Sequence, residues 1–393
     1  MLGKRTRDLG GPDPVKRIRL FFAFFTLFLT VSSVLSAGEN RWDPARTWVF
    51  AVGILEWEDS SSYVSFPQKN RKDARLVELF KERGVPVDQV LFLQDASATQ
   101  FAMERKLVEF LRRIRSGDSL FYYFAGHGDR DESGRGYFIP HDARGDSLSE
   151  TAFSHARLFG LLEQHFRGGR IFLTADCCYS GGLVIEARQR AKKFAVACLT
   201  SALSNAPSTG HWTFTESLID GLGGAAQVDG DENGIITLGE ITEYTAAEMA
   251  FGEEQYVGFF TSPAFTVPFE WGSAGKKSGD RVGERLEVFW KKVWWKVRII
   301  GQDRDRLQVH YLGWDEQWDE WIQGNSLRWR SYQPKVYPIG SEVEVLWEER
   351  WYRARILRVE RGLHRIHYVG WPEIWDEWVG TQRLRSPSVG SKR

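Results

Sequence analysis

Two residues that could do nucleophilic chemistry stand at the ends of two apolar stretches of the sequence. His127 lies between two glycines and follows the apolar run at residues 119–125, and Cys178 follows the run at 170–176. A cysteine attacks a carbonyl carbon as a thiolate, and a neighbouring imidazole that takes its proton makes it a competent acyl-transfer nucleophile. The glycines allow a tight turn around His127, and the N–H groups of Gly128 and Cys178 could together stabilise a tetrahedral oxyanion.

The stretches that carry these residues belong to an alternating pattern of apolar strands and amphipathic helices. This pattern predicts strands at about residues 48–55, 90–93, 119–125, 170–176 and 194–201, with helices at about 71–84, 98–114 and 153–166. Such alternation is typical of a mainly parallel sheet covered by helices on both faces, which carries its sites at the carboxyl ends of its strands. The sequence therefore predicts an α/β domain with His127 and Cys178 at one edge of the sheet.

Both segments resemble motifs of the caspase and metacaspase families, the metacaspases more closely. Metacaspase-like proteins carry Ser-Gly-His-Gly and Asp-x-Cys-His-Ser-Gly segments, and this chain has Ala125-Gly-His-Gly and Asp176-Cys-Cys-Tyr-Ser-Gly. In caspases the His precedes the Cys by about 50 residues, and here the separation is 51. The alignment makes Cys178 the nucleophile, although Ala125 replaces the family's Ser and Tyr179 replaces its second His. The resemblance covers residues 46–270 and implies a caspase-like peptidase domain in which His127, Cys178 and Gly128 form the catalytic site.

The resemblance also implies a substrate preference. Metacaspase-like enzymes cleave after Arg or Lys by using two acidic residues, and Asp73 and Asp176 occupy the matching positions. Carboxylates can replace the hydration that a guanidinium or ammonium group loses in a closed pocket. In the alternative interpretation, Asp73 caps its helix and Asp176 is a solvated strand end.

The expected function is that of a cysteine endopeptidase whose substrates are proteins or peptides and whose chemistry requires no cofactor. The rival interpretation is a catalytically silent caspase-like scaffold whose C-terminal region binds a peptide, a modified Lys or Arg, or an envelope ligand.

Residues 229–240 match the ligand pattern of a calcium-binding EF-hand loop. Oxygen ligands at alternate positions and a glycine at the turn suit a hard cation. The candidate ligands are Asp229, Asp231, Asn233, Ile235 and Glu240. The preceding segment is unlike that of an ordinary EF-hand, because a glycine-rich break at residues 221–224 comes before the loop. Ca²⁺ binding and a metal-free turn that caps a helix at residues 237–251 therefore both stay open.

After a linker at residues 271–281, the sequence repeats itself with a period of 57 residues. Thirteen of the seventeen Trp lie at or after Trp271, and most of them recur in both copies. Short alternating strands predict two small all-β barrels, at residues 282–331 and 338–388.

The string Tyr-x-Gly-Trp followed by Trp-Asp-Glu-Trp resembles the Tudor-knot, chromo-barrel and Agenet group. In that group aromatic side chains line a cage for a methylated ammonium group or a peptide, through cation–π attraction. A barrel this small also needs large side chains to build its core, so several of the aromatics must be structural. The candidate cage residues are Tyr311, Trp314 and Trp318 in the first copy and Tyr368, Trp371 and Trp375 in the second.

The first 37 residues have the layout of a secretory signal. Six basic residues precede an apolar run at Leu20–Leu35 of about 16 residues, which is shorter than the roughly 20 that a membrane-spanning helix needs. We expect a cleaved signal, with a retained anchor as the alternative, and therefore a secreted or cell-envelope protein that meets the membrane only through an uncleaved segment.

The remaining composition excludes other classes of protein. The formal net charge is zero, and acidic residues are interspersed through the basic barrels, so a nucleic-acid partner is not expected. The three cysteines are too few for a disulfide framework and contain no CxxC pair for zinc.

Overall fold

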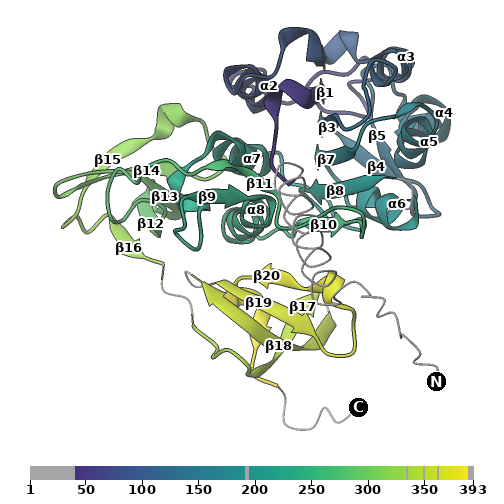
Figure 1. Ribbon diagram of the computed structural model, residues 1–393. Coiled ribbons are helices and arrows are strands. Elements are labelled where there is room, and N and C mark those ends of the chain that lie inside the picture. Colours follow the sequence, from purple (N-terminus) through teal and green to yellow (C-terminus); the bar gives the residue numbers. More distant parts are fainter. Residues whose placement is uncertain (1–39, 191–193, 333–334, 348–349, 361–362, 388–393) are drawn as a thin grey trace, which may run out of the picture. The chain divides into compact units, whose positions relative to one another are not determined.

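The structure is a computed structural model (Figure 1). It describes residues 40–190, 194–332, 335–347, 350–360 and 363–387. Trp42–Arg393 form one compact unit. The predicted signal at residues 1–37 lies outside the described residues, and within the described ranges no helix has the length and apolar character needed to span a membrane.

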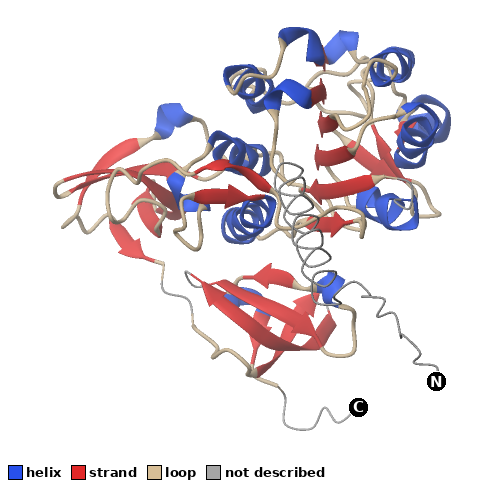
Figure 2. Cartoon of the chain, viewed as in Figure 1, coloured by secondary structure: helices blue, strands red, loops and turns tan. Residues whose placement is uncertain are grey.

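A six-stranded sheet is the centre of the N-terminal region (Figures 1 and 2). The strand order is β10-β8-β7-β3-β1-β2, and all neighbouring strands are parallel except β10, which is antiparallel to β8. The strands are β1 (Thr47–Gly53), β2 (Val90–Gln94), β3 (Ser119–Ala125), β7 (Arg170–Asp176), β8 (Ala195–Thr200) and β10 (Gly258–Thr261). The predicted mainly parallel sheet is confirmed, and β10 is an edge strand that the sequence pattern did not indicate.

Side-chain alternation along the strands divides the core into two layers. In β1, Phe50 and Val52 pack into one cluster while Val49 and Ala51 pack into the other, because successive side chains of a strand point to opposite faces. The first face is covered by α3 (Gln100–Leu111), α5 (His155–His165) and α6 (Gly182–Arg190). The second face is covered by α2 (Lys72–Glu82), α7 (Thr213–Gly223) and α8 (Leu238–Gly252). The helices predicted at 71–84, 98–114 and 153–166 are confirmed with shorter ends.

Shorter elements surround the sheet. A three-stranded sheet consists of β4 (Gly128–Arg130), β5 (Gly136–Phe138) and β6 (Phe153–Ser154), with α4 (Leu148–Thr151) before β6. A two-stranded sheet pairs β9 (Ile235–Thr237) with β11 (Glu270–Ser273). Because β3 ends at Ala125 and β4 begins at Gly128, His127 lies in the short turn between the central sheet and the three-stranded sheet.

The repeated region forms two curled, antiparallel, five-stranded sheets, and each has its own buried cluster. The first contains β12 (Arg285–Trp290), β13 (Val293–Asp303), β14 (Arg306–Tyr311), β15 (Glu320–Gln323) and β16 (Trp329–Ser331). The second contains β17 (Glu342–Trp347), β18 (Arg350–Glu360), β19 (Leu363–Tyr368), β20 (Glu377–Val379) and β21 (Leu384–Arg385). The strand register shifts at Ile299/Gly301 in one and at Ile356/Arg358 in the other, which are equivalent positions of the repeat. Two small all-β barrels are thus confirmed.

Candidate active site

The pairing of β3 with β7 brings His127 and Cys178 to the same edge of the sheet. Ala125, the last residue of β3, lies directly opposite Asp176, the last residue of β7. His127 and Cys178 each follow these paired residues by two positions. Neighbouring strands lie about 4.8 Å apart, so equal offsets from a paired register bring both residues to the same carboxyl edge.

The His127 ring is held by an aromatic wall and by one backbone carbonyl. Its ring centroid lies 4.4 Å from that of Trp57 and 4.6 Å from that of Phe66. Nε2 is 2.8 Å from the carbonyl oxygen of Val64; because a carbonyl only accepts, Nε2 carries the proton. Burial lowers the pKa of His127 by more than the bond to Val64 raises it. The resting imidazole is therefore neutral at pH 7, and its free nitrogen is Nδ1.

The two adjacent cysteines have different surroundings. The Cys177 side chain is buried in the core, and burial raises its pKa well above the ordinary value. The Cys178 side chain is half-buried, and its Sγ accepts a hydrogen bond of 3.1 Å from the backbone N–H of Ser208. Burial raises the pKa of Cys178 by more than this bond lowers it, so the resting thiol is protonated. Within the described residues, the thiol and the imidazole have their hydrogen bonds with Ser208 and Val64 and not with each other.

Gly128 packs directly against the turn that carries the cysteines. A Cβ atom at this position would lie 2.1 Å from the carbonyl oxygen of Cys178 and 2.9 Å from Sγ of Cys177. These contacts are closer than any side chain tolerates, so only glycine allows the two strand-end turns to meet. The backbone of Gly128 is consequently within the same small region as Cys178.

Asp73 and Asp176, which we call the acidic pair, both lie on the face of the sheet that α2 and α7 cover. Asp73 is fully buried in the first turn of α2. Asp176 accepts a hydrogen bond of 2.6 Å from the Thr215 hydroxyl, which also lies 2.7 Å from the hydroxyl of Tyr123. Burial raises the pKa of Asp176 to about 7, against the lowering by Thr215 and Ser201. Asp176 is 9% exposed, so it is not a solvated strand end.

Three neighbours of the site lie in loops that the sequence analysis did not single out. Val64 and Arg71 precede α2, and Ser208 lies in the loop before α7. That loop is fastened by Gln255, which accepts a bond from Thr209 N and donates one to the carbonyl of Pro207, both at 3.0 Å. Loop residues have no hydrophobic periodicity, so nothing in the sequence pattern indicates them.

Comparison with known families agrees with this geometry. A model of the Caspase domain family matches residues 67–266, just over half of the chain. This chain belongs to the caspase-domain family. The match includes His127, Cys178 and both members of the acidic pair. A cysteine peptidase of the caspase and metacaspase type is thereby established at the level of the family.

Individual relatives and solved structures each match only part of this chain. Metacaspase-7 of Arabidopsis thaliana is 31% identical over 113 residues, which are 26% of this chain and 26% of that protein. The chain therefore spans about a quarter of the length of that relative. The crystal structure of the Geobacter sulfurreducens protein GSU0716 matches 58% of this chain and 99% of its own at 16% identity, with a TM-score of 0.41. The structure of Tbtudor matches 14% of this chain and 98% of its own at 22% identity, with a TM-score of 0.13.

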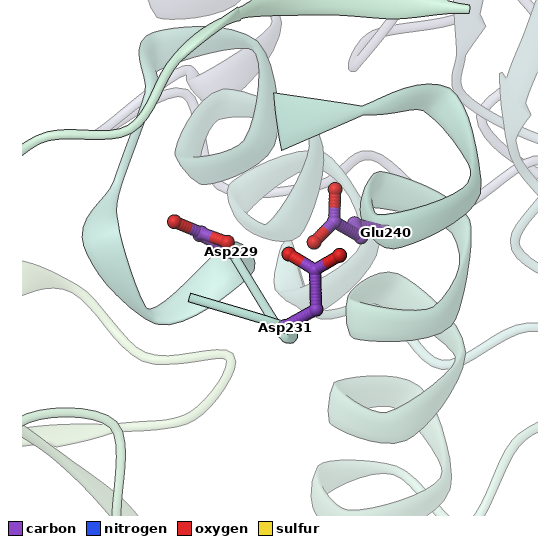
Figure 3. A group of neighbouring side chains, drawn as sticks. All are labelled: Asp229, Asp231 and Glu240. Carbon is purple, nitrogen blue, oxygen red and sulfur yellow. The ribbon is translucent and has the colours of Figure 1, made fainter. Parts of the chain in front are cut away.

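The candidate calcium loop of the caspase domain brings three carboxylates together (Figure 3). Asp229, Asp231 and Glu240 each place a carboxylate oxygen within 4.8 Å of the others. The same groups also bind the loop itself: Asp229 accepts from Gly234 N at 2.8 Å, and Glu240 accepts from Gly230 N at 2.9 Å. Thr237 and Glu240 form a capping box at the start of α8. The three carboxylates offer the oxygen ligands that a hard cation such as Ca²⁺ prefers. The capping box shows that the loop also stabilises the N-terminus of α8.

The candidate cage residues differ in exposure. Tyr311 and Tyr368 are buried, and their hydroxyls donate to Glu320 and Glu377, so these two are part of the barrel cores. The four tryptophans are exposed, and they are Trp314, Trp318, Trp371 and Trp375. The structure adds Trp290 and Trp347, whose ring centroids lie 5.6 Å from Trp318 and 5.9 Å from Trp375, respectively.

A cavity of about 760 Å³ lies between the second barrel and the caspase domain, and residues of α6, α8 and β10 line it together with the aromatics of the barrel. Trp347, Tyr368, Trp371 and Trp375 share its wall with four acidic residues. Those acids are Glu243, Glu373, Asp376 and Glu377. Aromatic faces and carboxylates both attract cations.

The first barrel is joined to the caspase domain by buried ion pairs. The pairs are Arg285–Glu248, Arg298–Glu248, Arg298–Asp220 and His310–Glu216, at 2.8, 3.0, 2.8 and 3.2 Å. Glu248 is fully buried, and its two arginines are less than a tenth exposed. Burial lowers the pKa of His310, but the hydrogen bonds that its ring donates to Asp319 and Glu216 raise this pKa to about 9. Charges this buried are stable only when paired, so the caspase domain and the first barrel depend on each other.

Proposed function

We propose that this protein is a cysteine endopeptidase that hydrolyses peptide bonds after Arg or Lys, with His127 and Cys178 as its catalytic dyad. The observation that carries the proposal is the paired register of β3 and β7, which puts an imidazole and a half-buried thiol at equal offsets beyond one sheet edge in a chain of the caspase-domain family.

The proposed reaction begins from a neutral thiol and a neutral imidazole. Nδ1 of His127 takes the proton of Cys178 as the sulfur attacks the carbonyl carbon of the substrate. The N–H groups of Gly128 and Cys178 stabilise the oxyanion. The imidazolium then gives its proton to the leaving amine, and water hydrolyses the thioester with His127 as the base. Attack requires the Cys178 sulfur to exchange its contact with Ser208 for one with the imidazole.

The test of the dyad uses the two cysteines as a matched pair. Cys178→Ala should abolish hydrolysis of a fluorogenic peptide that ends in Arg, because it removes the nucleophile, whereas Cys177→Ala should keep most of the activity, because Cys177 only fills the core. Activity that survives in Cys178→Ala, or that is lost only in Cys177→Ala, would overturn the assignment. Mass spectrometry of the incubated chain, with and without Ca²⁺, would report any self-cleavage in the same samples.

The preference for Arg or Lys rests on the acidic pair. Two buried carboxylates on one face of the sheet edge, near Tyr123, offer compensation for a cationic side chain. Kinetic comparison of peptides that end in Arg, Lys, Asp and Leu tests this preference, and equal turnover of the Leu peptide would contradict it.

The barrels are proposed to bind a peptide or a methylated ammonium group, and the aromatic side chains that the second barrel contributes to the cavity between it and the caspase domain support this role. The same cavity favours the second candidate function, a catalytically silent scaffold that acts through its barrels. Peptide binding by the full chain, without turnover of any peptide with or without Ca²⁺, would select the scaffold. Calcium binding at residues 229–240 and a secreted or envelope location are further proposals.

A further inference from the structure

Arg71 already places a guanidinium group on the acidic pair. Its Nη2 lies 2.6 Å from Oδ2 of Asp73, and its Nε lies 3.2 Å from both carboxylate oxygens. Nη1 donates to Asp95 and, at 3.1 Å, to Gln68, while Nη2 also donates to the carbonyl of Gly53 at 2.8 Å. All three nitrogens are engaged, and the side chain is only 12% exposed. A cation of the chain itself therefore occupies Asp73.

The Arg71 guanidinium lies at the carboxyl edge of the sheet, on the same edge as the candidate nucleophile. Gly53 ends β1, and its neighbours across the sheet are Ala125 and then Asp176. A Cβ atom on Gly53 would lie 1.9 Å from Oδ2 of Asp73, so the glycine is what allows that carboxylate to approach the edge. Both carboxyl groups lie near the hydroxyl of Tyr123. Burial raises the pKa of Tyr123, and the charges of Asp176 and Asp73 raise it further.

The two members of the acidic pair are unequal. Asp73 has the Arg71 guanidinium, whereas the bonds of Asp176 come from the hydroxyls of Thr215 and Ser201 and from backbone. A cationic substrate side chain that uses both carboxylates must therefore compete with Arg71 for one of them.

We propose that Arg71 is a specificity-determining residue that occupies Asp73 of the acidic pair in the resting enzyme, so that a substrate's basic side chain must displace its guanidinium from Asp73. This inference rests on the proposed function, because it requires Asp73 and Asp176 to receive that side chain.

The surroundings of Arg71 favour a side-chain movement over a movement of the backbone. Lys69 donates to Gln317 at 2.6 Å, and Lys72 contacts Glu316 at 2.7 Å and Glu216 at 3.2 Å. The backbone is thus tied on both sides of Arg71, partly by the first barrel. Asp95 is 23% exposed and already binds Nη1, so it can keep the guanidinium when Asp73 releases it.

The test measures binding and does not depend on turnover. In full-length chains that carry Cys178→Ala, calorimetry compares a peptide ending in Arg with the same peptide ending in citrulline, which has the same shape and no charge. Arg71→Gln should tighten binding of the Arg peptide by about tenfold or more, because it frees a charge-assisted set of bonds on Asp73, and should leave the citrulline peptide unchanged.

The matched control is Arg75→Gln, which removes an exposed arginine of the same helix that pairs with Glu82. It should change neither affinity. Arg71→Lys keeps the charge with fewer donors and should tighten Arg binding by a smaller factor, which preserves the test if Arg71→Gln does not fold.

Failure of the inference and failure of the proposed function give different results. An Arg-peptide affinity that is unchanged or weaker in a folded Arg71 variant overturns the role of Arg71, whatever the enzyme hydrolyses. Absence of hydrolysis by the chain with Cys178 intact, for any peptide, overturns the peptidase proposal.

Discussion

Asp176 should make the stability of this protein depend on pH in a direction opposite to that of most carboxylates. Burial raises its pKa to about 7 from an ordinary value of 3.8. The folded chain therefore holds this proton more tightly than the unfolded chain does. The resulting stabilisation is complete below the unfolded pKa and is lost as the pH rises through the folded pKa.

The size of the effect follows from the shift. About three pKa units correspond to about 4 kcal/mol of differential stability, of which roughly 2 to 3 kcal/mol is lost between pH 5 and pH 8. Asp176→Asn removes the titration and keeps the shape, so the wild-type side chain should lose about this much free energy of unfolding relative to the variant over that range. Any fixed cost of the amide, such as a poorer bond with Thr215, cancels in the difference between the two pH values.

Urea unfolding at pH 5 and pH 8, in chains that carry Cys178→Ala to prevent self-cleavage, measures the difference. Asp146→Asn replaces an exposed acid of the same domain and should show no such change. If the free energies of unfolding of wild type and Asp176→Asn differ by the same amount at both pH values, Asp176 is ionised at both. The inference that burial raises its pKa would then be wrong.

Two further outcomes are expected. Arg298→Ala should lower the free energy of unfolding by about 3 to 5 kcal/mol, because it breaks a buried ion pair of Glu248. Arg355→Ala removes the exposed arginine at the equivalent position of the second repeat and should cost less than about 1 kcal/mol. Equal effects of the two variants in urea unfolding would contradict the role of Arg298 in joining the first barrel to the caspase domain. Ca²⁺ should raise the melting temperature of the wild-type chain and not that of Asp229→Asn, and a shift common to both chains would show that the carboxylates of residues 229–240 are not the ligands.

The dyad was predictable from the sequence because the elements that carry it are regular. Wholly apolar stretches mark buried parallel strands, and residues that follow them must lie at the carboxyl edge. The pattern therefore predicts His127 and a cysteine at this edge, and the family resemblance selects Cys178 over Cys177. Their neighbours Val64 and Ser208 do not, because each lies in a loop whose path is fixed by tertiary contacts such as those of Gln255.

The ion pair between Arg71 and Asp73 could not be predicted either, because Arg71 also lies outside a regular element. Arg71 follows Asn70, whose φ of 60° is in the left-handed region, and the direction of the Arg71 side chain depends on that turn. Helical spacing predicts which residues of α2 face the sheet, but it cannot predict where a side chain before the first turn points.

Repetition predicted two equal folds, but not their unequal surroundings. Arg285 and His310 of the first copy are buried against acids of α7 and α8, while the equivalent positions hold an exposed Glu342 and a half-buried His367. The exchange of Arg285 for Glu342 is the sequence difference that corresponds to the buried acids beneath the first copy, and it can be interpreted only when those acids are known.

The buried ion pairs of the first barrel also determine where the caspase domain can be separated from the rest of the chain. The family match ends at residue 266, yet Glu248 on α8 pairs with Arg285 and Arg298, which lie beyond that boundary. A fragment that ends at residue 266 would leave Glu248 without Arg285 and Arg298. A recombinant form of the caspase domain should therefore include the first repeat. Both repeats pack on α8: the first through the buried pairs of Glu248, and the second through Leu363 and Trp378, which share a buried cluster with Ala250 and Phe251. One helix of the caspase domain therefore anchors both barrels.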